Sequence, residues 1–125
     1  MKRILCLLLV FTIVFSCNND DDNNGDQVIC TLVFVYGLDV TIIDSSTNAE
    51  ITEDITVTAI DGTYQEPLMR VDNSGRFFGA GERAGNYTIE VTGEGYQTFT
   101  SEVIEVTADQ CHVIPQVLEF TITPN

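Results

Sequence analysis

The sequence predicts an all-β protein, a single sandwich of seven or eight antiparallel strands. Between residues 28 and 123, apolar and polar residues alternate with a period of two rather than 3.6. Turn-forming residues interrupt this alternation about every 8–12 residues, and no long window has the apolar spacing of a helix. Short alternating strands of this kind typically pack as two sheets with Greek-key connections.

Each alternating segment is expected to form a strand or part of one. The segments are residues 30–42, 55–59, 63–71, 76–79, 87–91, 96–101, 102–106 and 112–123. Gly37 indicates a bulge or bend within the first of them. Pro115 has no N–H to donate to a ladder, so the last strand should lie at a sheet edge or carry a bulge. The core candidates of that last strand are Val117, Leu118, Phe120 and Ile122.

Turn residues separate the expected strands. Asp61 and Gly62 stand between two alternating runs, which predicts a tight hairpin with a positive φ at both central positions. Further turns are expected at residues 72–75, 93–95 and 108–110, which are rich in Asp, Asn and Gly.

Residues 1–16 have the features of a secretory signal peptide. Lys2 and Arg3 precede an apolar run at residues 4–15, which is too short to cross ~30 Å of hydrocarbon. The run ends in VFSC at residues 14–17, which resembles the lipobox of bacterial lipoproteins. The resemblance implies cleavage before Cys17 and acylation of Cys17, and two or three acyl chains would anchor the chain durably in a membrane. The alternative is ordinary secretion with a free Cys17 thiol.

Residues 17–27 are expected to form a flexible, acidic tether. The stretch NNDDDNNGD at residues 18–26 has no apolar residue that could be buried. It can be read simply as a spacer. It also resembles the surface-export signal of lipoproteins in the Bacteroidota, which would place the protein on the outer-membrane surface.

The charge excludes several partners. The chain carries a net charge of −14, and loss of Lys2 and Arg3 with the signal peptide would leave three bases against 19 acids, a net charge of −16. Such a chain repels phosphates, so nucleic acid is not expected as a partner. Nor is a basic patch available for an anionic membrane surface, so membrane attachment would depend on Cys17.

Four cysteines are present. Cys6 would be removed with the signal peptide and Cys17 would be acylated, which leaves Cys30 and Cys111 near the starts of the first and last expected strands. In an oxidising compartment these two are expected to form a disulfide that closes a loop of about 80 residues. The alternatives are two buried thiols or, together with His112, a metal site that lacks a fourth ligand.

Several motifs in order resemble the carboxypeptidase regulatory-like domain, a transthyretin-like sandwich. They are VTIID at 40–44 with STNAEI at 46–51, AGNYTIEV at 84–91 followed by GY at 95–96, and CHV at 111–113. Asn48 stands where the family usually has glycine, but asparagine tolerates the left-handed conformation. The resemblance covers about residues 31–123. It implies no peptidase activity, because in carboxypeptidases this domain is an accessory to a separate catalytic domain.

No catalytic residue, cofactor or metal is expected. His112 is the sole imidazole and is interpreted as structural, because the serines offer no nucleophile motif. Glu82 and Arg83 are expected to form local surface pairs. Tyr87 and Tyr96 are expected to be buried with bonded hydroxyls, or else to stack on a glycan.

Four aspartates in loops are interpreted as turn formers, with calcium binding as the alternative: Asp44, Asp54, Asp61 and Asp72.

Taken together, these sequence features favour a non-catalytic lipoprotein, tied to the membrane through Cys17, whose sandwich domain meets a protein or glycan partner. A small module that binds a glycan, a peptide or calcium is the alternative. An enzyme is disfavoured.

Overall fold

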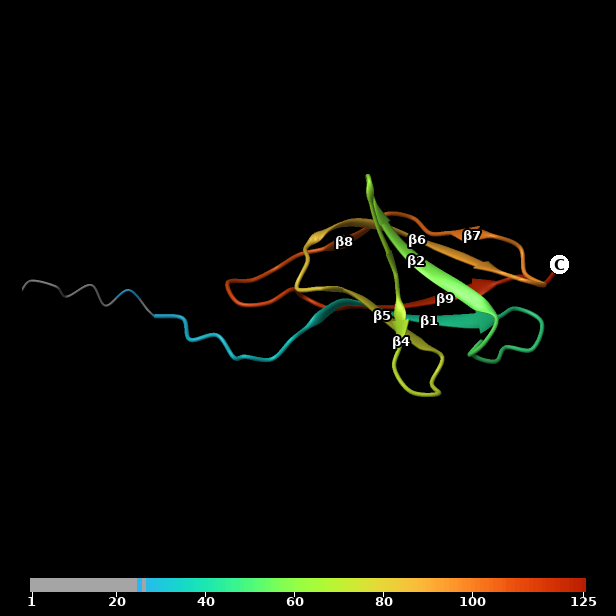
Figure 1. The fold of residues 1–125 in the computed structure, drawn as a ribbon, viewed down its shortest axis with the longest axis horizontal. Helices are drawn as coiled ribbons and strands as arrows, with labels where there is room; N and C mark the ends of the chain where they lie inside the picture. The colour runs from blue at the N-terminus through green and yellow to red at the C-terminus, as the bar shows by residue number, and fades with distance from the viewer. Residues whose placement is uncertain (1–24, 26) are drawn as a thin grey trace, which may run out of the picture.

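The computed structural model of the protein describes residue 25 and residues 27–125 (Figure 1). In this part of the chain, strands form two sheets that enclose a common core, so the all-β prediction is confirmed. The expected signal peptide and Cys17 lie outside the described residues, as does the tether apart from residues 25 and 27. The described part holds no helix long and apolar enough to cross a membrane. Its strands are β1 (Tyr36–Asp44), β2 (Ile55–Asp61), β3 (Tyr64–Pro67), β4 (Met69–Arg70), β5 (Arg76–Gly81), β6 (Gly85–Gly93), β7 (Phe99–Thr100), β8 (Ile104–Val106) and β9 (Gln116–Ile122).

The two sheets differ in how their strands run. One has the order β4-β5-β1-β9, and the other has the order β3-β2-β6-β7, with β8 also paired to β6. Among the described ladders, β1 and β9 alone pair in parallel, so the expectation of a purely antiparallel sandwich is wrong there. The chain reaches β9 by crossing over from β8 in the other sheet. Apolar residues alternate along a strand in the same way whether its neighbour runs parallel or antiparallel. The sequence pattern therefore could not predict that β1 and β9 are parallel.

The first strand begins later than its alternation suggests. It was expected at residues 30–42, but β1 runs from Tyr36 to Asp44. Residues 28–34 are exposed, bend at Leu32 and pair with no other described strand. Gly37 allows close contact with the opposite sheet, because a Cβ at this position would lie 2.6 Å from Val106 Cγ1.

The expected return strand at residues 63–71 is divided between the two sheets. β3 pairs with β2, whereas β4 pairs with β5 in the other sheet. Leu68 lies between them, is buried, and donates its N–H to the Val57 carbonyl at 2.8 Å. The chain thus changes sheets around one apolar side chain that fills the edge of the core.

The tight hairpin after β2 is confirmed, but its turn is shifted by one residue. Asp61 pairs with Tyr64, so the two central residues are Gly62 and Thr63. Of these only Gly62 has a positive φ, of 60°, which suits a turn with glycine at its first central position.

The core is formed by alternate residues of the central strands. Leu38, Val40 and Ile42 of β1 face Val57, Ala59, Ile89 and Val91 of β2 and β6, and all are almost fully buried. In β9, Leu118 lies beside Val40 on the inner face, whereas Val117 lies beside Asp39 on the outer face. Val117 is therefore exposed, and its prediction as a core residue is wrong. β9 does lie at a sheet edge, as Pro115 predicted.

Tyr87 is buried in the middle of the domain with its hydroxyl bonded, as expected. The hydroxyl donates to the Arg83 carbonyl at 2.9 Å and accepts from Arg83 Nη1 at 2.7 Å.

Tyr87→Phe would remove both hydrogen bonds of this buried side chain, although Arg83 Nη1 would keep its bond to Asp61, so we expect a loss of about 1–2 kcal/mol in the free energy of unfolding. Urea unfolding would measure it against Tyr36→Phe, because the Tyr36 hydroxyl makes no hydrogen bond with the described residues. Equal losses in the two variants would contradict this role.

Candidate functional site

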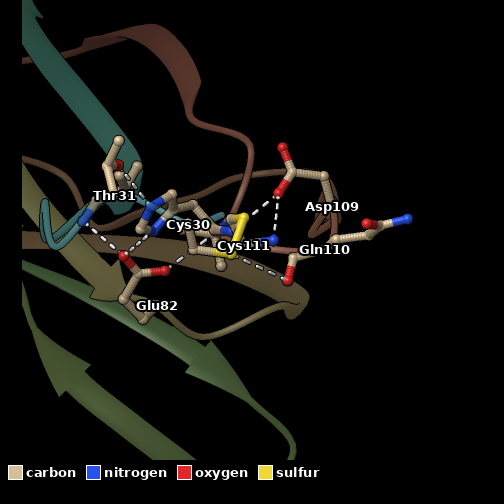
Figure 2. Close-up of polar contacts among 9 residues, drawn as sticks. Cys30, Thr31, Glu82, Asp109, Gln110 and Cys111 are labelled. Atoms are coloured by element: carbon tan, nitrogen blue, oxygen red, sulfur yellow. Dashed lines mark hydrogen bonds and ion pairs between the residues drawn. A yellow bond between two sulfur atoms is a disulfide. The ribbon is translucent and has the colours of Figure 1, made fainter. Parts of the chain in front are cut away.

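A disulfide between Cys30 and Cys111 fastens the chain at the end of the sandwich where it enters the domain (Figures 1 and 2). The two Cα atoms are 5.2 Å apart, and 81 positions separate the residues in sequence. The expected pairing is therefore present, and the alternatives of free thiols or a metal site with His112 are wrong. We call the surrounding cluster the neck; it consists of Cys30, Thr31, Val35, Glu82, Asp109, Cys111, His112 and Val113.

Glu82 joins three segments of the neck. Its Oε1 accepts the Val35 N–H at 2.9 Å, and its own N–H donates to the Val35 carbonyl at 2.9 Å. Its Oε2 accepts the Val113 N–H at 3.3 Å. The expected local pairing with Arg83 is wrong, because the partners of Glu82 come from segments more than 29 residues away in sequence. Glu82 also has a φ of 48°, a strained value for a residue with a side chain, which its several contacts offset.

His112 lies between Glu82 and Thr31. Its Nδ1 is 2.8 Å from Glu82 Oε1 and its Nε2 is 3.1 Å from Thr31 Oγ1. A carboxylate can only accept, so Nδ1 carries the proton, and in the neutral ring Nε2 accepts from the threonine hydroxyl. The order hydroxyl, imidazole, carboxylate is that of a hydrolytic triad.

Two observations favour a structural role for these three residues. Both carboxylate oxygens of Glu82 also hold main-chain N–H groups of the neck. A cleft lined by Asp54, Leu68 and Arg70 lies elsewhere, between the two sheets, and involves none of the three. Sequence reasoning missed this arrangement because Thr31, Glu82 and His112 are far apart along the chain and form no motif.

Asp109 shapes the loop that carries Cys111. Its Oδ1 accepts the N–H of Cys111 at 2.8 Å and that of His112 at 2.9 Å (Figure 2). These main-chain hydrogen bonds, that of His112 first, lower the pKa of Asp109. The turn expected at residues 108–110 is thus built around a carboxylate that positions the disulfide and the histidine together.

The neck should weaken in acid. Burial raises the pKa of Glu82, but hydrogen bonds from His112 and from the N–H groups of Val35 and Val113 outweigh it, and the net pKa is lowered. A carboxyl with a lowered folded-state pKa stabilises the fold above its unfolded value of 4.5, and that contribution disappears as the pH falls further. We expect Glu82→Gln to be less stable than wild type at about pH 6, with the difference shrinking at about pH 3. Urea midpoints at both values would test this, and a difference independent of pH would contradict it.

Two of the loop aspartates, Asp44 and Asp72, accept hydrogen bonds from residues of their own turns. Asp44 Oδ1 accepts from the N–H and the hydroxyl of Ser46, and its Oδ2 accepts from the Tyr96 hydroxyl at 3.0 Å. The hydrogen bond from the Ser46 hydroxyl is the main cause that lowers the pKa of Asp44. Asp72 accepts the Ser74 N–H in the same way. No group of three or more His, Cys, Asp or Glu arranged for a metal ion is found within the described residues.

A cleft of about 500 Å³ lies at the edge between the two sheets. It is lined by Thr52, Glu53, Asp54, Ile55, Leu68, Arg70 and Phe77. Arg70 pairs with the buried Phe77 across β4 and β5, so both side chains lie on the inner face of their sheet. Among the described residues, Arg70 has no ion-pair partner, whereas Arg76 and Arg83 are paired with Asp39 and Asp61. No pattern in the sequence indicated this cleft, because the cleft forms only where the chain changes sheets at Leu68.

No family model matches this chain, and no curated protein is detectably similar to it.

Proposed function

We propose that the protein is a non-catalytic lipoprotein of the cell envelope. Acyl chains on Cys17 anchor it to the outer membrane, and a carboxypeptidase regulatory-like sandwich is displayed at the cell surface for a protein or glycan partner. Support for the anchor comes from the lipobox at residues 14–17. Support for display comes from the acidic residues that follow Cys17.

The direction of the domain relative to its entry point carries the proposal. The chain enters at the neck, where the disulfide and Glu82 fasten it, and β1 then runs away from the neck for nine residues, roughly 25–30 Å. The 45–50 loop and the C-terminus lie at the opposite end (Figure 1). Tyr96 and Asp44 tie that end together across the two sheets. A domain anchored at the neck would therefore hold these loops outward.

Surface display can be tested on intact cells. We expect added proteinase K to degrade the wild-type protein without lysis, and we expect cells to incorporate labelled fatty acid into the wild-type protein but not into Cys17→Ser. A periplasmic protein of the same cells serves as the control for envelope integrity. Protection of the protein in intact cells would contradict surface display, whereas incorporation of the label that survives Cys17→Ser would contradict the anchor.

The non-catalytic part of the proposal has a direct test at the neck. Thr31, His112 and Glu82 are the residues with triad-like geometry. We expect the protein and its Thr31→Val variant to hydrolyse p-nitrophenyl acetate at the same rate. A wild-type rate about tenfold or more above that of the variant would instead assign acyl-transfer chemistry to the neck.

A second candidate function, the binding of a short peptide, is favoured by the cleft. Arg70 has no ion-pair partner among the described residues, and Glu53 and Asp54 line the same cleft. This combination suits a ligand that carries both a carboxylate and an ammonium group, as a short peptide does. Titration with the dipeptide Gly-Gly should shift amide resonances of residues 52–55 and 68–70. Arg70→Gln or amidation of the peptide should weaken binding about tenfold or more, because each removes a charged hydrogen bond. Unchanged spectra would exclude this candidate.

A further inference from the structure

The segment before β1 presents an unusual run of exposed apolar side chains. Five of the seven residues at 28–34 are large hydrophobics, and each is at least half exposed: Val28 51%, Ile29 87%, Leu32 105%, Val33 62% and Phe34 61%. Scattered apolar residues are normal on protein surfaces, but contiguous ones mark contact sites. We call residues 28–34 the apolar segment.

The neck holds the apolar segment in this exposed position. Cys30, a residue of the segment, forms the disulfide with Cys111. Val35 follows the segment directly, and both its N–H and its carbonyl are hydrogen-bonded to Glu82. The Phe34 ring lies over Gly81, where an added Cβ would approach its Cζ to 2.2 Å, and meets Tyr36 edge-on at 5.1 Å. The segment is therefore attached to the domain at Cys30 and at Phe34, while its other large side chains face solvent.

The position of the segment in the chain indicates what covers it. Ten residues separate Cys17 from Val28. A flexible chain of that length spans roughly 16–19 Å on average. The headgroup region of one leaflet is roughly 5–8 Å thick. Acyl chains on Cys17 would thus keep the apolar segment, on average, within reach of the membrane surface.

The charges around the apolar segment indicate how it could bind a membrane surface. The mature sequence has no lysine, and its first arginine is Arg70. Acidic residues at 20–22 and 26 lie just before the segment. Contact with a bilayer would consequently depend on apolar burial rather than on attraction to anionic lipid.

We propose that the apolar segment inserts into the interface of the membrane that holds Cys17, as a second attachment that orients the domain. This inference rests on the proposed lipid anchor. Two linked attachments reinforce one another, because the first raises the effective concentration of the second at the surface. The domain would then stand with the neck against the lipid and with the 45–50 loop directed away from it.

The absence of tryptophan from the sequence makes a sensitive test possible. The protein is prepared from residue 17 onward with Cys17→Ser, so that no acyl chain contributes, and Leu32→Trp supplies the sole tryptophan. With phosphatidylcholine vesicles we expect a saturable blue shift of its emission and quenching by lipids labelled in the acyl chain. Thr47→Trp, in the loop at the far end, is the matched control and should show neither.

A second variant identifies the side chains responsible. Ile29→Ser with Val33→Ser, in the Leu32→Trp background, should weaken vesicle binding at least about tenfold, because two apolar contacts are lost. Both residues are largely exposed, so the fold is retained. Unchanged emission of Leu32→Trp would overturn the proposal, as would an equal response of Thr47→Trp. Acylation of Cys17 is measured separately on the full chain, so failure here is distinguishable from failure of the anchor.

Discussion

Replacing Cys30 and Cys111 together by serine is expected to lower the free energy of unfolding by up to about 4–5 kcal/mol. The disulfide closes a loop over a separation of 81 positions, and the chain-entropy model assigns a loss of this size to the freed unfolded chain. The double variant avoids leaving a lone reactive thiol. Guanidinium unfolding of the two proteins under non-reducing conditions would measure the difference.

The matched control for the disulfide is Cys17→Ser. This variant also removes a sulfur, but Cys17 lies outside the described domain and is not a partner in its disulfide, so the domain should unfold like wild type. Reduction of the wild-type disulfide should reproduce the loss seen in the double variant. A loss below about 1 kcal/mol would mean that the hydrogen bonds of Glu82 hold the neck without the covalent link.

Replacing Arg76 by glutamine is expected to destabilise the fold, and by clearly more than replacement of an exposed, unpaired arginine. Asp39 lies on the outer face of β1 but is buried there, with its side chain only 9% exposed. Arg76 approaches both of its oxygens, Nε at 3.1 Å from Oδ1 and Nη2 against Oδ2. Loss of the arginine would leave the buried Asp39 carboxylate without a counter-ion, which is costlier than loss of an exposed pair. Because Arg76 is itself half exposed, solvent reduces this cost relative to that of a fully buried pair.

A double-mutant cycle separates this effect from simple loss of side-chain packing. Asp39→Asn together with Arg76→Gln should cost less than Arg76→Gln alone, since no buried charge remains unpaired. Arg70→Gln on the neighbouring strand should change stability by no more than about 0.5 kcal/mol, because Arg70 is exposed. Equal costs for Arg70→Gln and Arg76→Gln would contradict the importance assigned to Asp39.

Local pattern was sufficient where burial follows the alternation. In β6, Tyr87, Ile89 and Val91 are buried as the period of two predicted, and the hairpin beside Gly62 was placed within one residue. The same rule failed for residues 30–35, which alternate but have no sheet to join. The error at Val117 has another origin: it was predicted as core because it is apolar, whereas the alternation itself places it on the face opposite to Leu118.

The neck could be predicted only in part. The pairing of Cys30 with Cys111 was predicted because Cys6 and Cys17 were assigned to the signal peptide and the lipid anchor, and the disulfide is present. The role of Glu82 did not follow, because its contacts to Val35 and Val113 join segments that only the folded chain brings together. Contacts between segments that are distant in sequence leave no periodic signal. A residue that joins several such segments, as Glu82 does, can therefore be recognised only in the tertiary structure.

The central claim is that Cys17 carries the membrane anchor of this domain. Mass spectrometry of the protein extracted from cell membranes tests it most directly. The expected result is an amino-terminal peptide that begins at Cys17 and bears acyl chains on that residue. A mature chain that begins elsewhere, or an unmodified Cys17, would contradict the claim.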